Sequence, residues 1–337
     1  TGEFAGKLPE NAHLYRGHVD VEKYVAPTME EDREINKKHY TIFVYIWRMI
    51  MENFIPQGYQ SALSLHDTQV GIKTVKDFFQ NLLAQRLNLT RVSAPLFVDP
   101  KSGLNDNLNG FERPVTFDIK EQNGKEAEVV HSLAKWKRMA LDRYGFNPGE
   151  GIYTDMNAIR RDEDMDNLHS IYVDQWDWER VIERSDRTEE FLKSCVTKIV
   201  DALCDTLDTV KKSFPAVNTK LERNVFFITT AELEDMYPDF TAKERERAIA
   251  KEHGTVFVMK IGDKLKSGKP HDGRAPDYDD WQLNGDIIIY NEVLEDAFEI
   301  SSMGIRVDEK SLDYQLRESG KDERRSFDYH KQILNGT

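Results

Sequence analysis

The chain has 337 residues, a formal net charge of −14 at pH 7 and a hydrophobic content of 39%. The length allows one large domain or two, and the hydrophobic content is enough for a sizeable core. The acidic balance argues against a broad nucleic-acid surface, which needs a basic face, but a few arginines could still hold a small anion. The longest apolar run, residues 42–50, contains Arg48 and is too short to span a bilayer, so we expect no membrane association.

Two cysteines, Cys195 and Cys204, fall nine residues apart in one predicted helix. This spacing is not that of a metal site, and it fits reduced thiols in a reducing compartment. No signal peptide is recognisable in the sequence. We therefore expect a cytoplasmic protein.

The first predicted elements are helical. Residues 1–58 are expected to form an N-terminal extension with one helix, residues 30–54, whose role would be packing or dimer contact. A clear amphipathic helix follows, with Asp67 or Thr68 as its expected N-cap. Its apolar residues recur at helical spacing and are Ile72, Val75, Phe79, Leu82, Leu83 and Leu87.

A strand over residues 90–97, broken by Pro95, leads into a polar loop over residues 102–110. The loop contains Asp106 among asparagines and glycines. A loop of this composition is normally an ordinary turn. From the residues alone, Asp106 is therefore no more than a candidate.

A short strand over residues 128–131 runs into a helix that is expected to begin near Ser132. The hydroxyl of Ser132 and the free N–H groups of the first turn can hold an anion. Positive charge lies close by in Lys135, Lys137 and Arg138. The alternative is a capped helix with a solvated basic face.

An unusually polar strand is predicted over residues 170–179. Its alternation places Gln175, Asp177 and Glu179 on one face, about 7 Å from one to the next. Such a strand either faces water at a sheet edge or holds those groups toward a ligand. A charged loop with Arg160 precedes it and completes a predicted hairpin. That arginine could clamp a phosphate in a forked contact, although charge runs of this kind are usually solvated.

The next segment mixes strands and helices without a repeating βαβ pattern. A long core-facing helix is predicted over residues 188–214, and strands over residues 224–228 and 255–261. Two capping boxes should begin helices, the second of which ends at Gly254. They pair Thr229 with Glu232 and Thr241 with Glu244. This order favours an antiparallel α+β domain over a doubly wound one.

A second dense polar stretch covers residues 269–286, where two prolines and a glycine forbid a regular element. It contains Arg274, Asp277, Tyr278, Asp279 and Asp280. We expect Asp286 at the start of an apolar strand, and Glu299 along a further strand over residues 292–306. Carboxylates on strands beside an arginine loop suit Mg²⁺ bridging nucleotide phosphates. The alternative is a polar sheet edge protected by charge.

Several of these segments together resemble a known family. The sequences VVHSLAKWKR, YVDQWDWERV, HDGRAPDYDDW, LNGDI and EDAFEISSMGIRVD closely resemble the ammonia-dependent aspartate–ammonia ligases, the one-domain asparagine synthetases. The resemblance runs from about Tyr59 to the C-terminus, so residues 59–337 are expected to be the catalytic domain. It implies an α+β fold with an antiparallel β-sheet flanked by helices, similar to the catalytic domain of class II aminoacyl-tRNA synthetases.

Two segments resemble motifs of that synthetase class. The helix before residues 91–95 is similar to the first motif, a dimer element, and implies a homodimer. Residues 159–163 with the following strand are similar to the second motif, whose arginine holds the α-phosphate. The resemblance to the ligase family implies that L-aspartate, ATP and ammonia give L-asparagine, AMP and diphosphate through a β-aspartyl-adenylate, with ATP as a substrate and Mg²⁺ as cofactor.

The resemblance also assigns roles to particular residues. Asp106, Arg160 and Gln175 would be catalytic, and we further hypothesise that Asp106 accepts a proton from ammonium or the attacking amine. Aspartate would be bound by Ser132, Lys137, Asp106, Gln175 and Asp177. The nucleotide would be bound by Arg160, Ser170, Arg274, Tyr278, Asp279, Asp286, Glu299, Ser301 and Ser302. The metal would be held by Asp286 and Glu299.

The sequence departs from the family at its end. The glycine-rich third motif, whose arginine helps to hold ATP, has no counterpart before Thr337, and a truncated chain is the interpretation we favour. The alternatives are an inactive paralogue that binds aspartate or AMP, and an aspartyl-tRNA synthetase-like fragment. The acidic balance argues against the second alternative.

Overall fold

The computed structural model describes residues 55–105 and 112–336. All of them belong to one compact unit, Asn53–Thr337. The helix expected over residues 30–54 and the candidate Asp106 lie outside the described residues. No helix in the described ranges combines the length and apolar character needed to cross a membrane.

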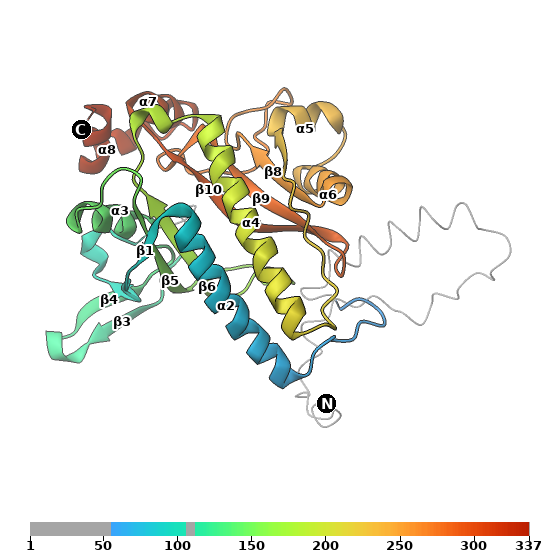
Figure 1. Cartoon of the computed structure of the whole chain (residues 1–337). Helices are drawn as coiled ribbons and strands as arrows, with labels where there is room; N and C mark the ends of the chain where they lie inside the picture. The colour runs from blue at the N-terminus through green and yellow to red at the C-terminus, as the bar shows by residue number, and fades with distance from the viewer. Residues whose placement is uncertain (1–54, 106–111, 337) are drawn as a thin grey trace, which may run out of the picture. The chain divides into compact units, whose positions relative to one another are not determined.

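The described elements alternate between helices and strands in an order without a simple repeat (Figure 1). The helices are α2 (Leu65–Leu87), α3 (Ala134–Arg143), α4 (Glu189–Ser213), α5 (Thr230–Met236), α6 (Ala242–His253), α7 (Glu309–Glu318) and α8 (Asp328–Leu334). The strands are β1 (Leu89–Arg91), β2 (Phe97–Val98), β3 (Thr116–Ile119), β4 (Lys125–Val129), β5 (Gly151–Ile159), β6 (Tyr172–Arg180), β7 (Phe226–Thr229), β8 (Thr255–Met259), β9 (Asp279–Asn291) and β10 (Asp296–Arg306).

Within the described residues these strands form three sheets, with the orders β1-β5-β6, β10-β9-β8-β7 and β2-β4-β3. Pairing is antiparallel except between β1 and β5 and between β7 and β8, which run parallel. The predicted α+β class, with antiparallel sheets flanked by helices, is confirmed. The predicted hairpin is also confirmed, because β5 and β6 pair from Gly151 with Arg180 to Ile159 with Tyr172.

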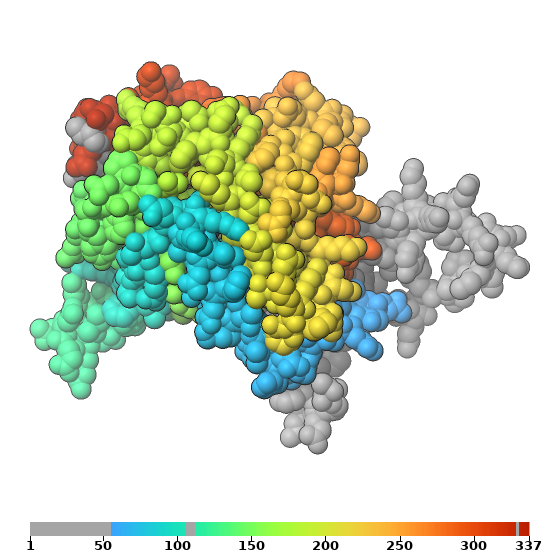
Figure 2. All heavy atoms as spheres, in the orientation of Figure 1, coloured from blue at the N-terminus to red at the C-terminus, as the bar shows by residue number. Residues whose placement is uncertain are grey.

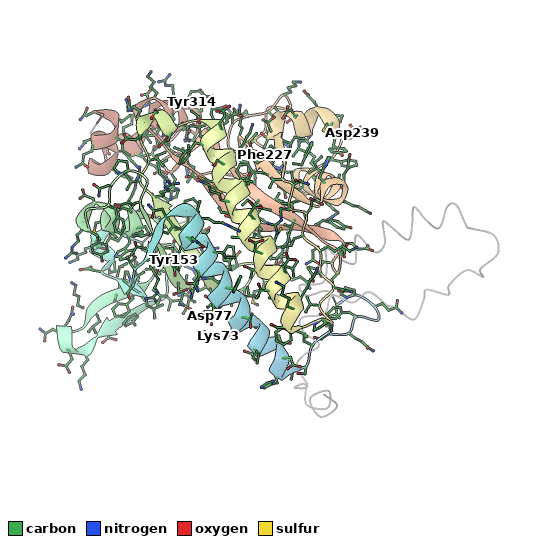
Figure 3. All side chains as sticks on the ribbon, in the orientation of Figure 1. Lys73, Asp77, Tyr153, Phe227, Asp239 and Tyr314 are labelled. Carbon is green, nitrogen blue, oxygen red and sulfur yellow. The ribbon has the colours of Figure 1, made fainter. Side chains whose placement is uncertain are left out.

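Helices α2 and α4 together cover one face of the first two sheets. Phe79, Leu83 and Leu87 recur every four residues and so form one stripe of α2. They are buried in one cluster with the apolar face of α4, with Tyr153 of β5 and with Phe257 of β8. Figure 1 shows the two helices side by side across the strands, and Figure 2 shows them together at the surface of this face. Figure 3 labels Tyr153 on this side of the molecule.

The opposite face of the strands carries the polar groups. Side chains alternate along β6, so Trp176 and Trp178 pack toward the helical layer, whereas the carboxylates of Asp177 and Glu179 point to the other face. On that face α3 packs against β5 through a separate core cluster. Helix α6 covers β7, β8 and β9 through a third cluster, which includes Ile249 and Ile288.

Most expected helix boundaries are confirmed. Both capping boxes form, and α6 ends at the positive-φ residue Gly254. The expected N-cap of α2 is wrong. Ser64 caps this helix, because its hydroxyl accepts a hydrogen bond from the backbone N–H of Asp67 at 3.0 Å.

Two strand predictions need correction. The strand expected over residues 90–97 is two short strands, β1 and β2, because Pro95 interrupts the ladder between them. Asp286 is not at the start of its strand but in the middle of β9, which begins at Asp279. The strand begins well before its apolar run, because its first residues, among them Trp281, are already buried.

Candidate active site

Arg306, the last residue of β10, joins the first sheet to the second. Its Nε and Nη2 atoms each lie 3.1 Å from one carboxylate oxygen of Glu179 on β6, which makes a forked ion pair. Its Nη1 donates to Asp279 at the start of β9 at 2.5 Å. The guanidinium lies 3.8 Å from the ring centroid of Tyr278, in cation–π contact. One side chain therefore ties three strands together.

A local irregularity of β10 places Arg306 in this position. The pairing register with β9 shifts between Gly304, which pairs with Asn284, and Arg306, which pairs with Asp279. A Cβ atom at Gly304 would lie 2.8 Å from Cγ of Asp279, closer than such contacts allow. Glycine at this position therefore lets the Asp279 side chain reach Arg306.

Lys137 brings helix α3 to the same place. Its side chain is 2% exposed, and its ammonium pairs with Asp177 of β6. The ammonium also donates to the carbonyl of Trp178 at 3.0 Å and lies 3.9 Å from a carboxylate oxygen of Glu179. A buried lysine needs such partners, because an isolated charge in the interior is very costly.

Glu179 is a buried carboxylate that lies between two cations, Arg306 and Lys137. Burial by itself would raise its pKa, but the charges of Arg306 and Lys137 outweigh burial and hold the pKa below its ordinary value. Glu179 is therefore ionised at neutral pH. The local charges alternate in sign from Lys137 to Glu179 to Arg306.

A second group of charges lies on β9 and β10. Arg274 pairs with Asp286 and donates to the hydroxyl of Ser302 at 2.6 Å. Asp286 and Ser302 are directly paired residues of the two strands. Burial raises the pKa of Asp286, and the nearby Arg274 only partly offsets this effect.

Glu299 completes the second group. Part of the surface of Glu299 is exposed to solvent. Burial of the carboxyl by neighbouring atoms is the largest cause of its raised pKa, and the charge of Asp286 adds to it, so that the pKa of Glu299 rises to about 7. Glu299 pairs with Ile288 of β9, two residues from Asp286, so the two carboxylates lie on the same face of the sheet. Such an arrangement favours a cation beside them.

Asp279 connects the two groups. It is bonded to Arg306, and its charge also contributes to the raised pKa of Arg274. Tyr278 lies beside it, and its hydroxyl oxygen is buried with no hydrogen-bond partner in the described part of the chain. We call the resulting series of cations paired with carboxylates the charged row: Lys137, Asp177, Glu179, Arg306, Asp279, Arg274 and Asp286.

The structure thus brings several predicted residues together. Lys137 meets Asp177, and Arg274 meets Asp286 and Ser302, with Tyr278 and Asp279 between the two groups. Gln175 lies two residues before Asp177 and so points to the same face of β6. The hydroxyl of Ser132, at the start of α3, accepts the backbone N–H of Ala134 at 3.2 Å.

Other predicted residues have no described contact with the charged row. Arg160 follows β5 and lies 3.9 Å from Glu163, and its Nε is buried without a partner among the described atoms. Ser170 is exposed in the loop of the β5–β6 hairpin. Ser301 precedes Ser302 on β10, next to a register shift. The roles of these residues stay predictions.

Sequence reasoning did not select Glu179 or Arg306 as site residues. The alternation of β6 places Glu179 on the polar face of the strand, but this pattern fits either exposure to water at a sheet edge or a ligand. No such pattern indicates Arg306, because its position depends on the register shift after Gly304. A buried glutamate and an arginine that are distant in sequence do not reveal their pairing.

A separate hollow of about 470 Å³ lies between β9 and α7. Asp280, Trp281 and Tyr314 are among the residues that line it, and none of the predicted site residues does. Asp280 is already paired with Arg187 at 2.8 Å. We place the chemistry at the charged row rather than in this hollow.

A protein-family model described as aspartate–ammonia ligase matches residues 66–337. The aspartate–ammonia ligase of Ruminiclostridium cellulolyticum is 62% identical over 280 residues, which cover 83% of this chain and 83% of that protein. Those of Clostridium tetani and Clostridium perfringens are 61% and 56% identical, and the alignments cover 83% and 84% of this chain and 82% and 84% of those proteins.

Two solved structures share the fold. The asparaginyl-tRNA synthetase of Pyrococcus horikoshii, complexed with asparaginyl-adenylate, aligns with a TM-score of 0.54 at 17% identity over 79% of this chain and 60% of that one. The Entamoeba histolytica asparaginyl-tRNA synthetase, in complex with asparaginyl-adenylate, aligns with a TM-score of 0.53 at 13% identity over 94% and 66%. At these identities the likeness shows the fold alone, which is that of a class II synthetase.

Replacing the buried carboxylate, Glu179→Gln, should destabilise the protein by about 3 kcal/mol at pH 7, because Arg306 loses one of its two charged partners and Lys137 loses a nearby anion. The folded-state pKa of Glu179 is depressed, so its stabilisation is complete above its unfolded value of 4.5 and is lost as the pH falls through the folded pKa. The difference in free energy of unfolding between variant and wild type should therefore shrink below pH 4.5, as measured by urea denaturation.

The matched control is Asp77→Asn, which breaks an exposed ion pair with Lys73 on the surface of α2 (Figure 3). Exposed pairs of this kind contribute little. Equal destabilisation by the two substitutions would contradict a special role for Glu179.

Proposed function

The chain belongs to the aspartate–ammonia ligase family, and we propose that the charged row is where it joins ammonia to the side-chain carboxylate of L-aspartate. ATP would supply the energy, and L-asparagine, AMP and diphosphate would be the products. The observation that carries this proposal is the pairing of buried and half-buried cations with carboxylates from Lys137 to Asp286. Such a row matches a zwitterionic amino acid at one end and a metal-bound phosphate at the other.

Lys137 and Asp177 form the amino-acid end. A buried lysine–aspartate pair presents one cation and one anion at fixed positions, which complement the α-carboxylate and α-ammonium of aspartate. Lys137, together with Ser132, would hold the α-carboxylate. Asp177 and Gln175 would lie around the amino group and the side chain.

Arg160 and the second group of charges form the nucleotide end. That group consists of Arg274, Asp286, Glu299 and Ser302. In the first step an oxygen of the aspartate side chain attacks the α-phosphorus of ATP, and the bond to diphosphate breaks. Arg160 would neutralise the charge that develops on the α-phosphate. Tyr278 and Asp279 would place the nucleotide next to the amino acid, since they lie between the two ends of the charged row.

In the second step ammonia attacks the carbonyl carbon of the β-aspartyl-adenylate, and the bond to AMP breaks. The attacking nitrogen must lose a proton, and we keep Asp106 as the proposed acceptor. Binding the two reactants in the correct orientation supplies most of what this chemistry requires, because the adenylate is already reactive.

Mg²⁺ fits the pair of carboxylates at the nucleotide end. The described residues contain no cluster of three or more metal-binding side chains. Mg²⁺ usually takes only one or two carboxylates and completes its shell with phosphates and water, so Asp286 and Glu299 are sufficient. When bound, the ion would neutralise charge on the phosphates.

Two further properties are proposed. Both cysteines are free and buried, which is consistent with a reducing cytoplasm, and recovery of the protein mainly outside the cytosolic fraction would contradict this. Helix α2 leaves Leu65 and Ile72 exposed in its first half and Phe78 exposed just beyond its middle. We propose that a second copy of the chain covers this surface in a homodimer.

The alternatives raised by the sequence gain no support. A synthetase fragment rests only on the shared fold, at 18% identity or less. An inactive paralogue would not need the buried pairs of the charged row. The aspartate–ammonia ligase reaction is therefore the function that we propose.

Arg160→Ala should abolish adenylate formation, with a loss of 10² to 10³ in rate typical of a lost transition-state donor. Aspartate-dependent release of diphosphate from ATP measures this step. The neighbouring arginine gives the control, and Arg161→Ala should keep most of the activity. Diphosphate release that persists in Arg160→Ala would refute the assigned role.

Divalent-cation binding should strengthen as the pH rises from 6 to 8. The pKa of Glu299 is raised to about 7, so its carboxyl is mostly protonated at pH 6 and must lose a proton before it binds a cation. Titration of the protein with Mg²⁺ and ATP at several pH values measures the effect. Glu299→Gln should bind more weakly and lose the pH dependence, and an unchanged profile in this variant would exclude Glu299 as a ligand.

Ile72→Asp should convert the proposed dimer to a monomer, because a charge would be buried in an apolar interface. Sedimentation equilibrium of wild type and variant measures the mass directly. Lys73→Asp, at the next position of the same helix, controls for a simple change in charge. A monomeric wild type at micromolar concentration would overturn the dimer.

A further inference from the structure

An ionic cluster with two buried members and one exposed member lies beside the nucleotide end of the charged row. Glu246 of α6 bonds through one carboxylate oxygen to Nε2 of His271 at 3.0 Å and through the other to the ammonium of Lys243 at 2.9 Å. Glu246 and His271 are only 5% and 6% exposed. We call Lys243, Glu246 and His271 the α6 cluster.

The position of Glu246 is unusual for a carboxylate. It lies three and four residues before Ile249 and Ala250, on the stripe of α6 that packs into the core. A buried ion pair at such a site is rarely more stabilising than apolar side chains of similar volume. The fold alone therefore gives little reason for a glutamate here.

The α6 cluster is connected to the nucleotide end by the chain itself. His271 precedes Arg274 by three residues in the irregular segment between β8 and β9. Helix α6 packs against β9 at Ile288, which points to the same face as Asp286. The His271–Glu246 hydrogen bond therefore holds the segment that carries Arg274 against α6.

The pairing register of the sheet also brings the two groups together. Glu299 pairs with Ile288 of β9, and Ile288 packs in one core cluster with Ile249 of α6. The α6 cluster and the nucleotide end therefore lie on the same face of the sheet.

Lys243 is the accessible member of the α6 cluster. Its side chain is 65% exposed while its ammonium is held by the buried Glu246, and it lies 3.8 Å from Asp272 in the Arg274 segment. A lysine ammonium is a compact charge that commonly binds phosphate. Arg160 is already the proposed partner of the α-phosphate. The phosphates of ATP that remain for Lys243 to bind are therefore the β- and γ-phosphates.

We propose that the α6 cluster extends the nucleotide site: Lys243 binds the β- and γ-phosphates of ATP, and the Glu246–His271 hydrogen bond positions the segment that carries Arg274. This inference rests on the proposed function and assigns a binding residue and two positioning residues to the same site. Lys243 acts on ATP but not on AMP, which has no β- or γ-phosphate.

The first test compares ATP with AMP by titration calorimetry in the presence of Mg²⁺ and without aspartate. Lys243→Gln should weaken ATP binding by about tenfold or more, as expected for a lost hydrogen bond to a charged group, and should change AMP binding less than twofold. Lys251→Gln, at an exposed position in the last turn of the same helix, is the matched control and should change neither.

The second test concerns positioning. Glu246→Gln should raise KM for ATP by fivefold or more and leave KM for aspartate within twofold. His271→Gln, which keeps a donor for Glu246, should retain more ATP affinity than His271→Leu. Glu234→Gln removes another buried carboxylate, which faces Arg245 of α6 at 3.8 Å. This control should lower thermal stability without changing KM for ATP.

The results can contradict the proposed function and the inference about the α6 cluster separately. A wild-type protein that does not bind ATP contradicts the proposed function. A wild type that binds ATP, with a Lys243→Gln variant that binds it equally well or loses AMP to the same extent, overturns the inference. Lys243 is exposed, so its variant decides the question even where the buried variants fail to fold.

Discussion

The forked ion pair between Arg306 and Glu179 is the interaction on which the site depends. It ties the end of β10 to β6, and the same guanidinium reaches Asp279 of β9. Because β6 carries the residues proposed for aspartate and β9 those proposed for the nucleotide, this contact sets the distance between the two substrates. The layer of α2 and α4 supports the opposite face of both sheets, so the polar face is held from behind while its side chains remain available to ligands. The position of the reactants thus follows from packing on one face and charge pairing on the other.

A row of largely buried charges stabilises a fold less than apolar side chains would. Removing Lys137 and Asp177 from water costs free energy that their mutual attraction only partly returns. Apolar side chains would stabilise the same space at least as well. The row is understandable as a site in which each charge can exchange its protein partner for a substrate group of the same sign. An amino-acid zwitterion and a metal-bound triphosphate together present such groups. At the nucleotide end, Asp286 and Glu299 share one face of the sheet, and Arg274 is paired with Asp286.

Much of this arrangement could be read from the sequence. The alternation of β6 predicted that Gln175, Asp177 and Glu179 share a face, and the spacing of Phe79, Leu83 and Leu87 predicted the core stripe of α2, because both patterns are local. The partner of Glu179 could not be predicted, since Arg306 reaches it only through a register shift after Gly304 and a contact between separate sheets. Asp286 was expected at the start of a strand, because the apolar run that follows it hid the polar beginning of β9. Periodicity describes the faces of elements, whereas pairings between distant elements depend on the tertiary fold.

The most direct test of the account follows one oxygen atom. L-Aspartate labelled with oxygen-18 in its side-chain carboxylate is incubated with the protein, ATP, Mg²⁺ and ammonium, and the products are analysed by mass spectrometry. If the side chain attacks the α-phosphorus and ammonia then displaces AMP, one labelled oxygen must be transferred to AMP for each asparagine formed. Label in diphosphate or orthophosphate, or asparagine formed without labelled AMP, would contradict an acyl-adenylate at the charged row.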